Sequence, residues 1–346
     1  YMATAINDFI QGIIMLVGIV AVIGAVVTQN GGLLAATQKL SAVPAAGWTG
    51  GAYTSFFGPD PVFLLFVVIL TSLGTWGLPQ MVGKFYAIKS ENDIHKGTVI
   101  STVFAIIVAG GCYFLGGFGR LYADKISYSA SGKPLFDTIV PAMLSTLAPV
   151  IIAVVIVLVL SASMSTLSSL VLTSSSTFTL DVIKPASKKE MTEKKQVLIM
   201  RIFIVFFIIV SAVIAIIKDA NPGVTFIAQM MGVSWGGLAG AFLAPYLYGL
   251  YSKKVTKASV VVCFIWGTGL AITQFAISMA GVDVAAWPSF FALMFKTSIH
   301  SGAFAMIGGL IIVPLVSLFT KKPSNEFVDK IFTCYDQKVQ TSVKES

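Results

Sequence analysis

The feature that most constrains this chain is a series of apolar stretches, each long enough to cross a lipid bilayer. A helix needs roughly 20 mostly apolar residues to span the hydrocarbon core. Eight stretches meet this condition, at residues 5–29, 61–83, 97–118, 147–180, 196–217, 224–250, 258–280 and 290–319. Only 11% of the 346 residues are charged, whereas soluble domains are about 25% charged. The sequence therefore predicts an all-α integral membrane protein.

The segments outside these spans predict a simple domain organisation. Residues 1–319 are expected to form one transmembrane domain, and residues 320–346 a polar tail. The Gly-, Ala- and Pro-rich connection 30–60 is expected to be a solvent-exposed loop with a short helix near 32–42. A second short helix is expected at 135–146.

The basic residues indicate how the chain is oriented in the membrane. Seventeen of the 23 Lys and Arg residues lie in alternate connections, namely 84–96, 181–201, 251–257 and the tail 320–346. Because positive residues are retained on the cytoplasmic side, the tail is expected to be cytoplasmic in a multi-pass protein of the plasma membrane. Topology thus explains the net charge of +8, and nucleic acid is not expected as a partner.

Residues 161–180, SASMSTLSSLVLTSSSTFTL, combine a membrane-type segment with many hydroxyl groups. Twelve of these twenty residues are Ser or Thr. At about 100° per residue on a helix, one face collects Ala162, Ser165, Thr166, Ser169, Thr173, Ser176 and Thr177. Such a stripe predicts a polar neighbour along this face of the helix.

Two interpretations of the stripe are open on these grounds. Hydroxyls in membrane helices bond back to the carbonyl of the preceding turn, and small residues allow close helix packing. Alternatively, Ser165, Thr166 and a loosened backbone carbonyl of Ala162 present three oxygens on one face, at spacing i, i+3 and i+4. Hard cations prefer oxygen ligands, so the second interpretation predicts a cation site.

The acidic residues favour a metal cation over a proton as the bound ion. All fifteen Asp and Glu residues lie in connections, tails or span edges, with Asp8 and Asp181 closest to a span. Proton-coupled transporters keep an ionisable group within the membrane, and none is expected here. The sequence also shows no catalytic acid pair, nucleophile triad or metal-binding His pattern, so an enzyme is not expected.

The span 61–83 contains helix breakers in the stretch GTWGLPQ. Gly74, Gly77 and Pro79 predict either an interrupted helix that exposes backbone groups to a substrate or an ordinary proline kink. Trp76 and Gln80 lie beside these breakers and are candidate substrate contacts.

The span 224–250 contains glycines at regular spacing. Gly232, Gly236 and Gly240 recur every four residues, a spacing typical of closely packed membrane helices. Trp235 and Pro245 lie in the same span and are compatible with a gate.

These stretches together resemble the sodium/solute symporter family, which includes bacterial proline and pantothenate carriers. The resemblance rests on four stretches in the family's order: INDFIQGIIML (6–16), GLPQMVGKFYAIKS (77–90), SASMSTLSSLVLTSSST (161–177) and SWGGLAGAFLAPYLYGLYSKKVTKAS (234–259). It covers nearly the whole chain, and the third and fourth stretches are the most specific.

The resemblance implies a five-plus-five inverted-repeat core of the leucine-transporter type, working by alternating access. Residues 5–29 would be the fifth core helix, residues 61–250 the second repeat, and two extra helices would follow. The first core helices are not among these residues, so the chain is expected to need the missing N-terminal half of the same transporter.

The resemblance also implies the ion and its site. The family motif AxxST matches Ala162, Ser165 and Thr166 position for position, and it implies sodium as the coupling ion. The stripe continuing through Ser169 and Thr173 toward Asp181 would then line a sodium exit path.

The substrate implied by the resemblance is a small organic solute. Proline carriers of the family have Trp and Tyr where this chain has Thr71 and Thr75, which favours a carboxylate such as pantothenate; sodium/proline symport is the alternative. Thr75, Trp76, Pro79, Gln80 and Trp235 are the candidate substrate or gate residues. A transporter-like sensor is a further alternative, although the tail 320–346 is too short for a catalytic domain.

Overall fold

The computed structural model is all-helical, with no β-strand among the residues it describes. It describes residues 2–85, 88, 90–128, 132, 134–187, 190–220 and 227–335. Six helices in this part of the chain are long and apolar enough to cross a membrane. Their bounds are Ile6–Gln29, Asn92–Lys125, Pro149–Ala186, Glu193–Ile217, Lys257–Ala280 and Ser298–Phe319.

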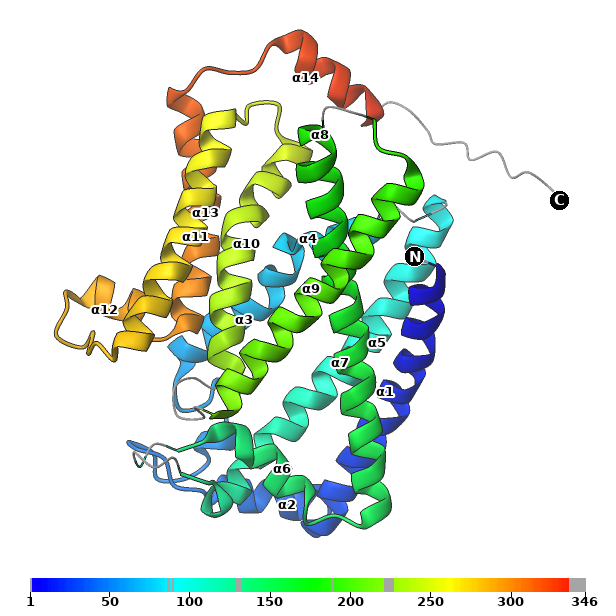
Figure 1. The fold of residues 1–346 in the computed structure, drawn as a ribbon. Coiled ribbons are helices and arrows are strands. Elements are labelled where there is room, and N and C mark those ends of the chain that lie inside the picture. Colours follow the sequence, from blue (N-terminus) through cyan, green and yellow to red (C-terminus); the bar gives the residue numbers. More distant parts are fainter. Residues whose placement is uncertain are drawn as a thin grey trace. The chain divides into compact units, whose positions relative to one another are not determined.

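The chain divides into two units, each made of two stretches of sequence. Unit 1 comprises Tyr1–Pro59 and Lys96–Gly223, and unit 2 comprises Asp60–His95 and Val224–Ser346. Figure 1 shows the helices of both units and their labels.

The described part of unit 1 contains four long helices and several shorter ones. Its α-helices are α1 (Met2–Gln29), α2 (Leu33–Ser41), most of α5 (Glu91–Gly117), α6 (Ile139–Leu144), α7 (Pro149–Thr177), α8 (Lys184–Ala186) and α9 (Glu193–Ala220). Short 3-10 helices cover Ala52–Thr54, Phe118–Lys125 and Phe136–Thr138, and a π-helical turn, Phe178–Ile183, joins α7 to α8.

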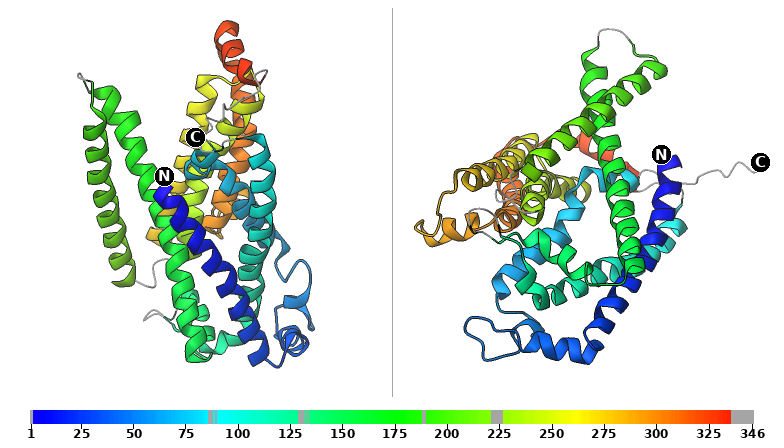
Figure 2. Two further views of the ribbon diagram at one scale, coloured as in Figure 1. Left: turned by 90° about the vertical axis from the view of Figure 1, so that its right-hand side faces the viewer. Right: turned by 60° about the horizontal axis from the view of Figure 1, so that its bottom comes forward.

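Helix α1 packs along α7, and the two lie side by side in Figures 1 and 2. Gly18 of α1 allows this approach, because a Cβ atom there would lie 2.6 Å from Leu158 Cδ1 of α7. The buried core of unit 1 lies at one end of this pair, where α1, α2, α6 and α7 meet. Its fully buried members include Val26, Ala36 and Met143.

Unit 2 is a bundle of three long helices with a broken helix against it. The long helices are α10 (Ile227–Tyr251), α11 (Lys257–Ala280) and α13 (Ser298–Phe319). The broken helix consists of α3 (Pro61–Gly74), the 3-10 turn η2 (Thr75–Gly77) and α4 (Pro79–Phe85). The remaining elements are α12 (Ser289–Phe295), α14 (Asn325–Phe332) and the 3-10 turn η6 (Thr333–Tyr335).

Local sequence sets where these helices begin and end. Asp60 caps α3 by accepting the backbone N–H of Phe63 at 2.9 Å, and Pro61 follows in the first turn. Thr256 and Ser259 form a capping box at the start of α11, and Gly281 ends it in the left-handed conformation that glycine favours. Thr297 caps α13 in the same way as Asp60 caps α3.

Glycines bring α10, α11 and α13 into backbone contact. A Cβ atom on Gly236 of α10 would lie 2.4 Å from Gly302 Cα of α13, and one on Gly267 of α11 would lie 2.4 Å from the backbone nitrogen of Ala241. A Cβ atom on Gly232 would lie 2.8 Å from the carbonyl carbon of Ser298. The close helix contact predicted from the glycine spacing is therefore confirmed.

Six predicted spans correspond to helices that can cross a membrane, and two need comment. The predicted span 61–83 is a broken helix whose first part, Pro61–Gly77, is shorter than a span. The predicted span 224–250 matches α10, but residues 221–226 lie outside the described residues. The count of eight spans therefore stays a prediction.

Three smaller predictions also have an outcome. The predicted span 290–319 begins at Ser298, because α12 is a separate helix that ends at Phe295. The short helices predicted near 32–42 and 135–146 correspond to α2 and α6. Residues 336–346 of the predicted tail lie outside the described residues.

Candidate functional site

Three hydroxyls of α7 bond back to their own helix, and one of them, Ser176, belongs to the stripe. Ser168 Oγ donates to the Ser165 carbonyl at 3.0 Å, Ser175 Oγ to Leu172 at 3.0 Å and Ser176 Oγ to Thr173 at 3.0 Å. These bonds satisfy the hydroxyls within the helix. For these residues, hydrogen bonding within the helix accounts for the hydroxyl, and no ligand is needed.

Ser165 behaves differently, because its hydroxyl leaves the helix. Ser165 Oγ donates to Asp8 Oδ1 of α1 at 2.7 Å. This is the short distance expected when a hydroxyl donates to a carboxylate. A hydroxyl that donates to a carboxylate keeps its oxygen lone pairs available for a cation. The sequence analysis had placed Asp8 at a span edge and had given it no role in the site.

A second polar side chain of α1, that of Gln11, shares a helix face with Asp8. The contacts Asp8–Ser165 and Gly18–Leu158 show that the two helices run antiparallel, and this register puts Gln11 near the level of Ala162. Gln11 is 5% exposed. Its side-chain oxygen Oε1 is the one buried side-chain N or O atom without a hydrogen-bond partner in the described part of the chain.

These residues carry oxygens of the kind that a hard cation prefers. Ser165 is half-buried and Thr166 is exposed on the same helix, while Asp8 and Gln11 add a carboxylate and an amide oxygen from α1. Helix α7 is continuous through Ala162, so the predicted loosening of its carbonyl is not observed. That carbonyl has only its second lone pair to offer. The all-oxygen donor set fits an alkali cation.

The residues predicted to line an exit path follow Ser165 and Thr166 in the sequence, toward the C-terminal end of α7. Ser169 and Thr173 are half-buried and follow Ser165 at intervals of four residues, so they share its face. Asp181 is exposed and lies in the π-helical turn Phe178–Ile183. Because a π-turn contains more residues than an α-turn, Asp181 is rotated away from the face that a continuous α-helix gives it.

The predicted substrate residues lie in unit 2, around the broken helix. Leu78 has an extended backbone between η2 and α4, as expected for a residue before proline. The helix is thus interrupted, as the first of the two interpretations requires, and exposure of its backbone groups to a substrate stays a prediction. A Cβ atom on Gly77 would lie 2.9 Å from Ala239 Cα, so the break packs directly on α10.

The individual candidates at the break differ in exposure. Trp76 is 60% exposed, whereas Pro79 and Gln80 are half-buried. Thr75 Oγ1 donates to the Ser72 carbonyl at 3.1 Å, so its proton is used within the helix. Trp235 is half-buried against the core that α3, α10 and α13 share.

Comparison with known proteins identifies the group to which this chain is related. The profile of the "Sodium:solute symporter family" matches residues 1–267. The chain belongs to this family. It is accordingly a multi-pass membrane protein of a transporter family rather than of an enzyme family.

Relatives with known names support the same assignment to the sodium:solute symporter family. The chain is 26% identical over 328 residues to the osmoregulated proline transporter OpuE of Bacillus subtilis, covering 94% of this chain and 60% of the relative. It is 25% identical over 286 residues to a sodium/pantothenate symporter of Haemophilus influenzae, covering 81% of this chain and 56% of the relative. A sodium/proline symporter of Staphylococcus aureus is 26% identical over 331 residues, covering 93% and 59%. The chain thus spans less than two thirds of the length of these symporters.

Sequence reasoning did not find Asp8 and Gln11. Both lie in the stretch INDFIQG, where their spacing of three residues puts them on one face of α1. That spacing is a usable signal, because an acidic and an amide side chain on one face of an apolar span need polar partners.

Proposed function

We propose that this chain acts in the sodium-coupled symport of a small organic solute. The observation that carries the proposal is the Ser165 hydroxyl bonded to the Asp8 carboxylate at 2.7 Å. Ser165 belongs to the motif AxxST, for which the resemblance to the family implies a sodium site. Sodium would be a transported substrate here, held by oxygens of α7 and α1. The helices of the relatives that this chain does not span would supply the rest of the core.

The role of Asp8 in this proposal follows from its contact. By accepting a hydrogen bond from the Ser165 hydroxyl, Asp8 fixes the orientation of that hydroxyl and increases the electron density on Ser165 Oγ. Partners of this kind behind a metal ligand tune affinity, and their loss typically weakens binding about 10–100-fold. The negative charge of Asp8 also offsets the cost of placing a cation in a span.

Coupling then requires that sodium binds one conformation better than the other. An ion with equal affinity for both states shifts no equilibrium, however tightly it binds. We propose that sodium favours the outward-open state and that the solute then permits closure. We also propose that the protein lies in the plasma membrane with eight spans and a cytoplasmic C-terminal tail. Its core would have the inverted-repeat arrangement.

We propose a carboxylate such as pantothenate as the solute. At the two positions where proline carriers of the family have aromatic residues, this chain has Thr71 and Thr75. The Thr71 hydroxyl donates to the Val67 carbonyl at 2.8 Å and the Thr75 hydroxyl to Ser72, so their protons are used within the helix. Proline is the second candidate, because relatives that cover most of this chain are named as proline carriers.

The sodium site is tested by Asp8→Asn and Thr166→Ala in the protein expressed from its complete gene. Uptake of radiolabelled pantothenate and proline is measured against sodium concentration. We expect either variant to raise the half-activating sodium concentration by about tenfold or more. Ser168→Ala is the matched control, since the Ser168 hydroxyl bonds to its own helix. An unchanged sodium dependence in both site variants contradicts the site.

A further inference from the structure

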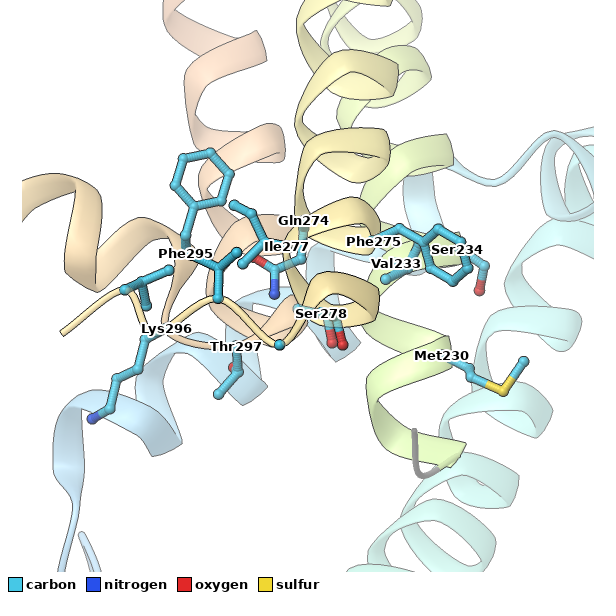
Figure 3. Close-up of a pocket in the computed structure, with 14 residues that line it drawn as sticks. Met230, Val233, Ser234, Gln274, Phe275, Ile277, Ser278, Phe295, Lys296 and Thr297 are labelled. Atoms are coloured by element: carbon cyan, nitrogen blue, oxygen red, sulfur yellow. The ribbon is translucent and has the colours of Figure 1, made fainter. Parts of the chain in front are cut away.

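Unit 2 contains a pocket that none of the candidate sodium or substrate residues lines. It has a volume of about 390 Å³ and lies where α10, α11 and the start of α13 meet. Figure 3 shows its lining side chains. In Figure 1 this end of α11, beside α12, is opposite to the end beside α14. Pockets of about 300–1,000 Å³ are typical of small-molecule sites.

The polar residues that line the pocket offer hydrogen-bond donors and a positive charge. Gln274 of α11 is 5% exposed. Its Oε1 lies 2.8 Å from the hydroxyl of Ser301, and its amide nitrogen points into the pocket in Figure 3. The exposed Lys296 stands at the rim, and Ser278 lies one turn after Gln274.

The electrostatic character of the pocket favours an anion. None of its lining residues is acidic. The acid nearest to them in sequence is Asp283, whose Oδ1 accepts the backbone N–H of Ala285 at 2.9 Å. Thr297 and Ser298 bring the first turn of α13 to the pocket, and the positive end of a helix dipole attracts negative charge.

Apolar side chains also line the pocket. They are Phe275 of α11, Phe295 of α12, Met230 of α10 and Val282 and Val284 of the connection after α11. Phe295 is held in place by Trp287, whose ring lies 5.9 Å from it in an edge-on arrangement. The apolar surface and the donors thus occupy one pocket, which is the pattern of a site for an amphipathic molecule.

We propose that this pocket binds an amphipathic anion. A carboxylate or phosphate head would contact Gln274, Lys296 and the first turn of α13, and an apolar body would lie against Phe275 and Phe295. The pocket shares no residue with the proposed sodium site, so this proposal does not depend on sodium-coupled symport. The ligand has two possible sources: a soluble organic acid and an anionic lipid of the bilayer.

Equilibrium binding to the full chain in phosphatidylcholine nanodiscs tests the proposal. The probe is radiolabelled 4-phenylbutyrate, with empty nanodiscs as background and 4-phenylbutanol as the uncharged competitor. Lys296→Gln is expected to weaken binding about tenfold, as expected for one charge-assisted hydrogen bond. Ser278→Phe, which fills the pocket, is expected to abolish saturable binding.

Matched controls separate the pocket from general effects of charge and size. Lys322→Gln removes a lysine beyond the other end of α13, and Met279→Phe enlarges an exposed neighbour that does not line the pocket. Both controls are expected to bind the probe as the unmodified chain does. Equal binding by Ser278→Phe and Met279→Phe, or displacement by 4-phenylbutanol as strong as by unlabelled 4-phenylbutyrate, overturns the proposal.

The source of the anion is distinguished by changing the bilayer. The same binding is measured in nanodiscs that contain phosphatidylglycerol. If phosphatidylglycerol competes with the probe in the unmodified chain, the pocket takes an anionic lipid. If the probe binds equally in both bilayers, the pocket takes a soluble acid. Both results support an anion site, whereas absence of saturable binding in both bilayers overturns it.

Discussion

Replacing Gly236 with alanine is expected to destabilise unit 2, because α10 and α13 touch through their backbones at this point. The added Cβ atom would lie 2.4 Å from Gly302 Cα, whereas ordinary contacts of such an atom are 3.4–4 Å. No side-chain rotation relieves this overlap, since the backbone fixes the position of the Cβ atom and Gly302 Cα is itself a backbone atom. The helices must therefore separate by about 1 Å at this point.

The free-energy cost follows from two opposing terms. Overpacking of a tight core costs roughly 1–3 kcal/mol. We expect the upper half of this range, because separating the helices also loosens the contact between Gly232 and Ser298. Alanine recovers up to about 1 kcal/mol relative to glycine within a helix. The net loss for Gly236→Ala is therefore about 2 kcal/mol.

The same helix offers two comparison variants. A Cβ atom on Gly249 would have nothing within 4 Å, so Gly249→Ala should be neutral or stabilising. A Cβ atom on Gly237 would lie 2.9 Å from Ala271 Cβ, which is a less severe overlap. The free energy of unfolding of Gly237→Ala should therefore lie between those of Gly236→Ala and Gly249→Ala. Equilibrium unfolding of the full chain in mixed micelles, followed by circular dichroism, measures all three. If Gly236→Ala is as stable as Gly249→Ala, the close packing is refuted.

Three further predictions follow from other contacts. Gly77→Ala should lower the free energy of unfolding by about 1–3 kcal/mol, since its Cβ would lie 2.9 Å from Ala239 Cα; unfolding as above measures this. If the stripe lines a sodium path, the variant Thr173→Cys should react more slowly with a water-soluble thiol reagent when sodium is added. A labelling rate that does not change with sodium contradicts this. Lys253→Met should speed proteolysis of α14 in the full chain, because it removes the Lys253–Asp329 contact of 2.8 Å; an unchanged cleavage rate shows that α14 does not depend on this contact.

Much of the helical framework was predictable, because each long helix coincides with a continuous apolar stretch of the sequence. The start of α3 follows from Asp60 and Pro61, and the close approach of α10 to its neighbours follows from Gly232 and Gly236. These signals lie within a few residues of the feature they specify. The interruption near Pro79 was one of two open interpretations, and the 3-10 turn followed by the extended backbone of Leu78 is what distinguishes it from a kink.

The parts that sequence reasoning missed depend on residues far apart in the chain. Asp8 and Ser165 are 157 positions apart, and their contact requires α1 and α7 to be antiparallel in one particular register. The π-helical turn before Lys184 and the separation of α12 from α13 likewise leave no periodic pattern in the sequence. Such features are set by packing between helices, which a single sequence does not display.

The α7 hydroxyls whose hydrogen bonds are defined fall into two groups, and this division favours one place on the helix for a cation. A hydroxyl that bonds to its own helix, like Ser168 or Ser176, costs the membrane segment little and needs no ligand. Ser165 instead directs its proton to the one carboxylate in α1, which leaves its oxygen as a polarised acceptor. Composition alone made twelve hydroxyls equal candidates. Because charge and orientation single out Ser165 and its partner Asp8, a cation bound anywhere along α7 is expected to bind there first.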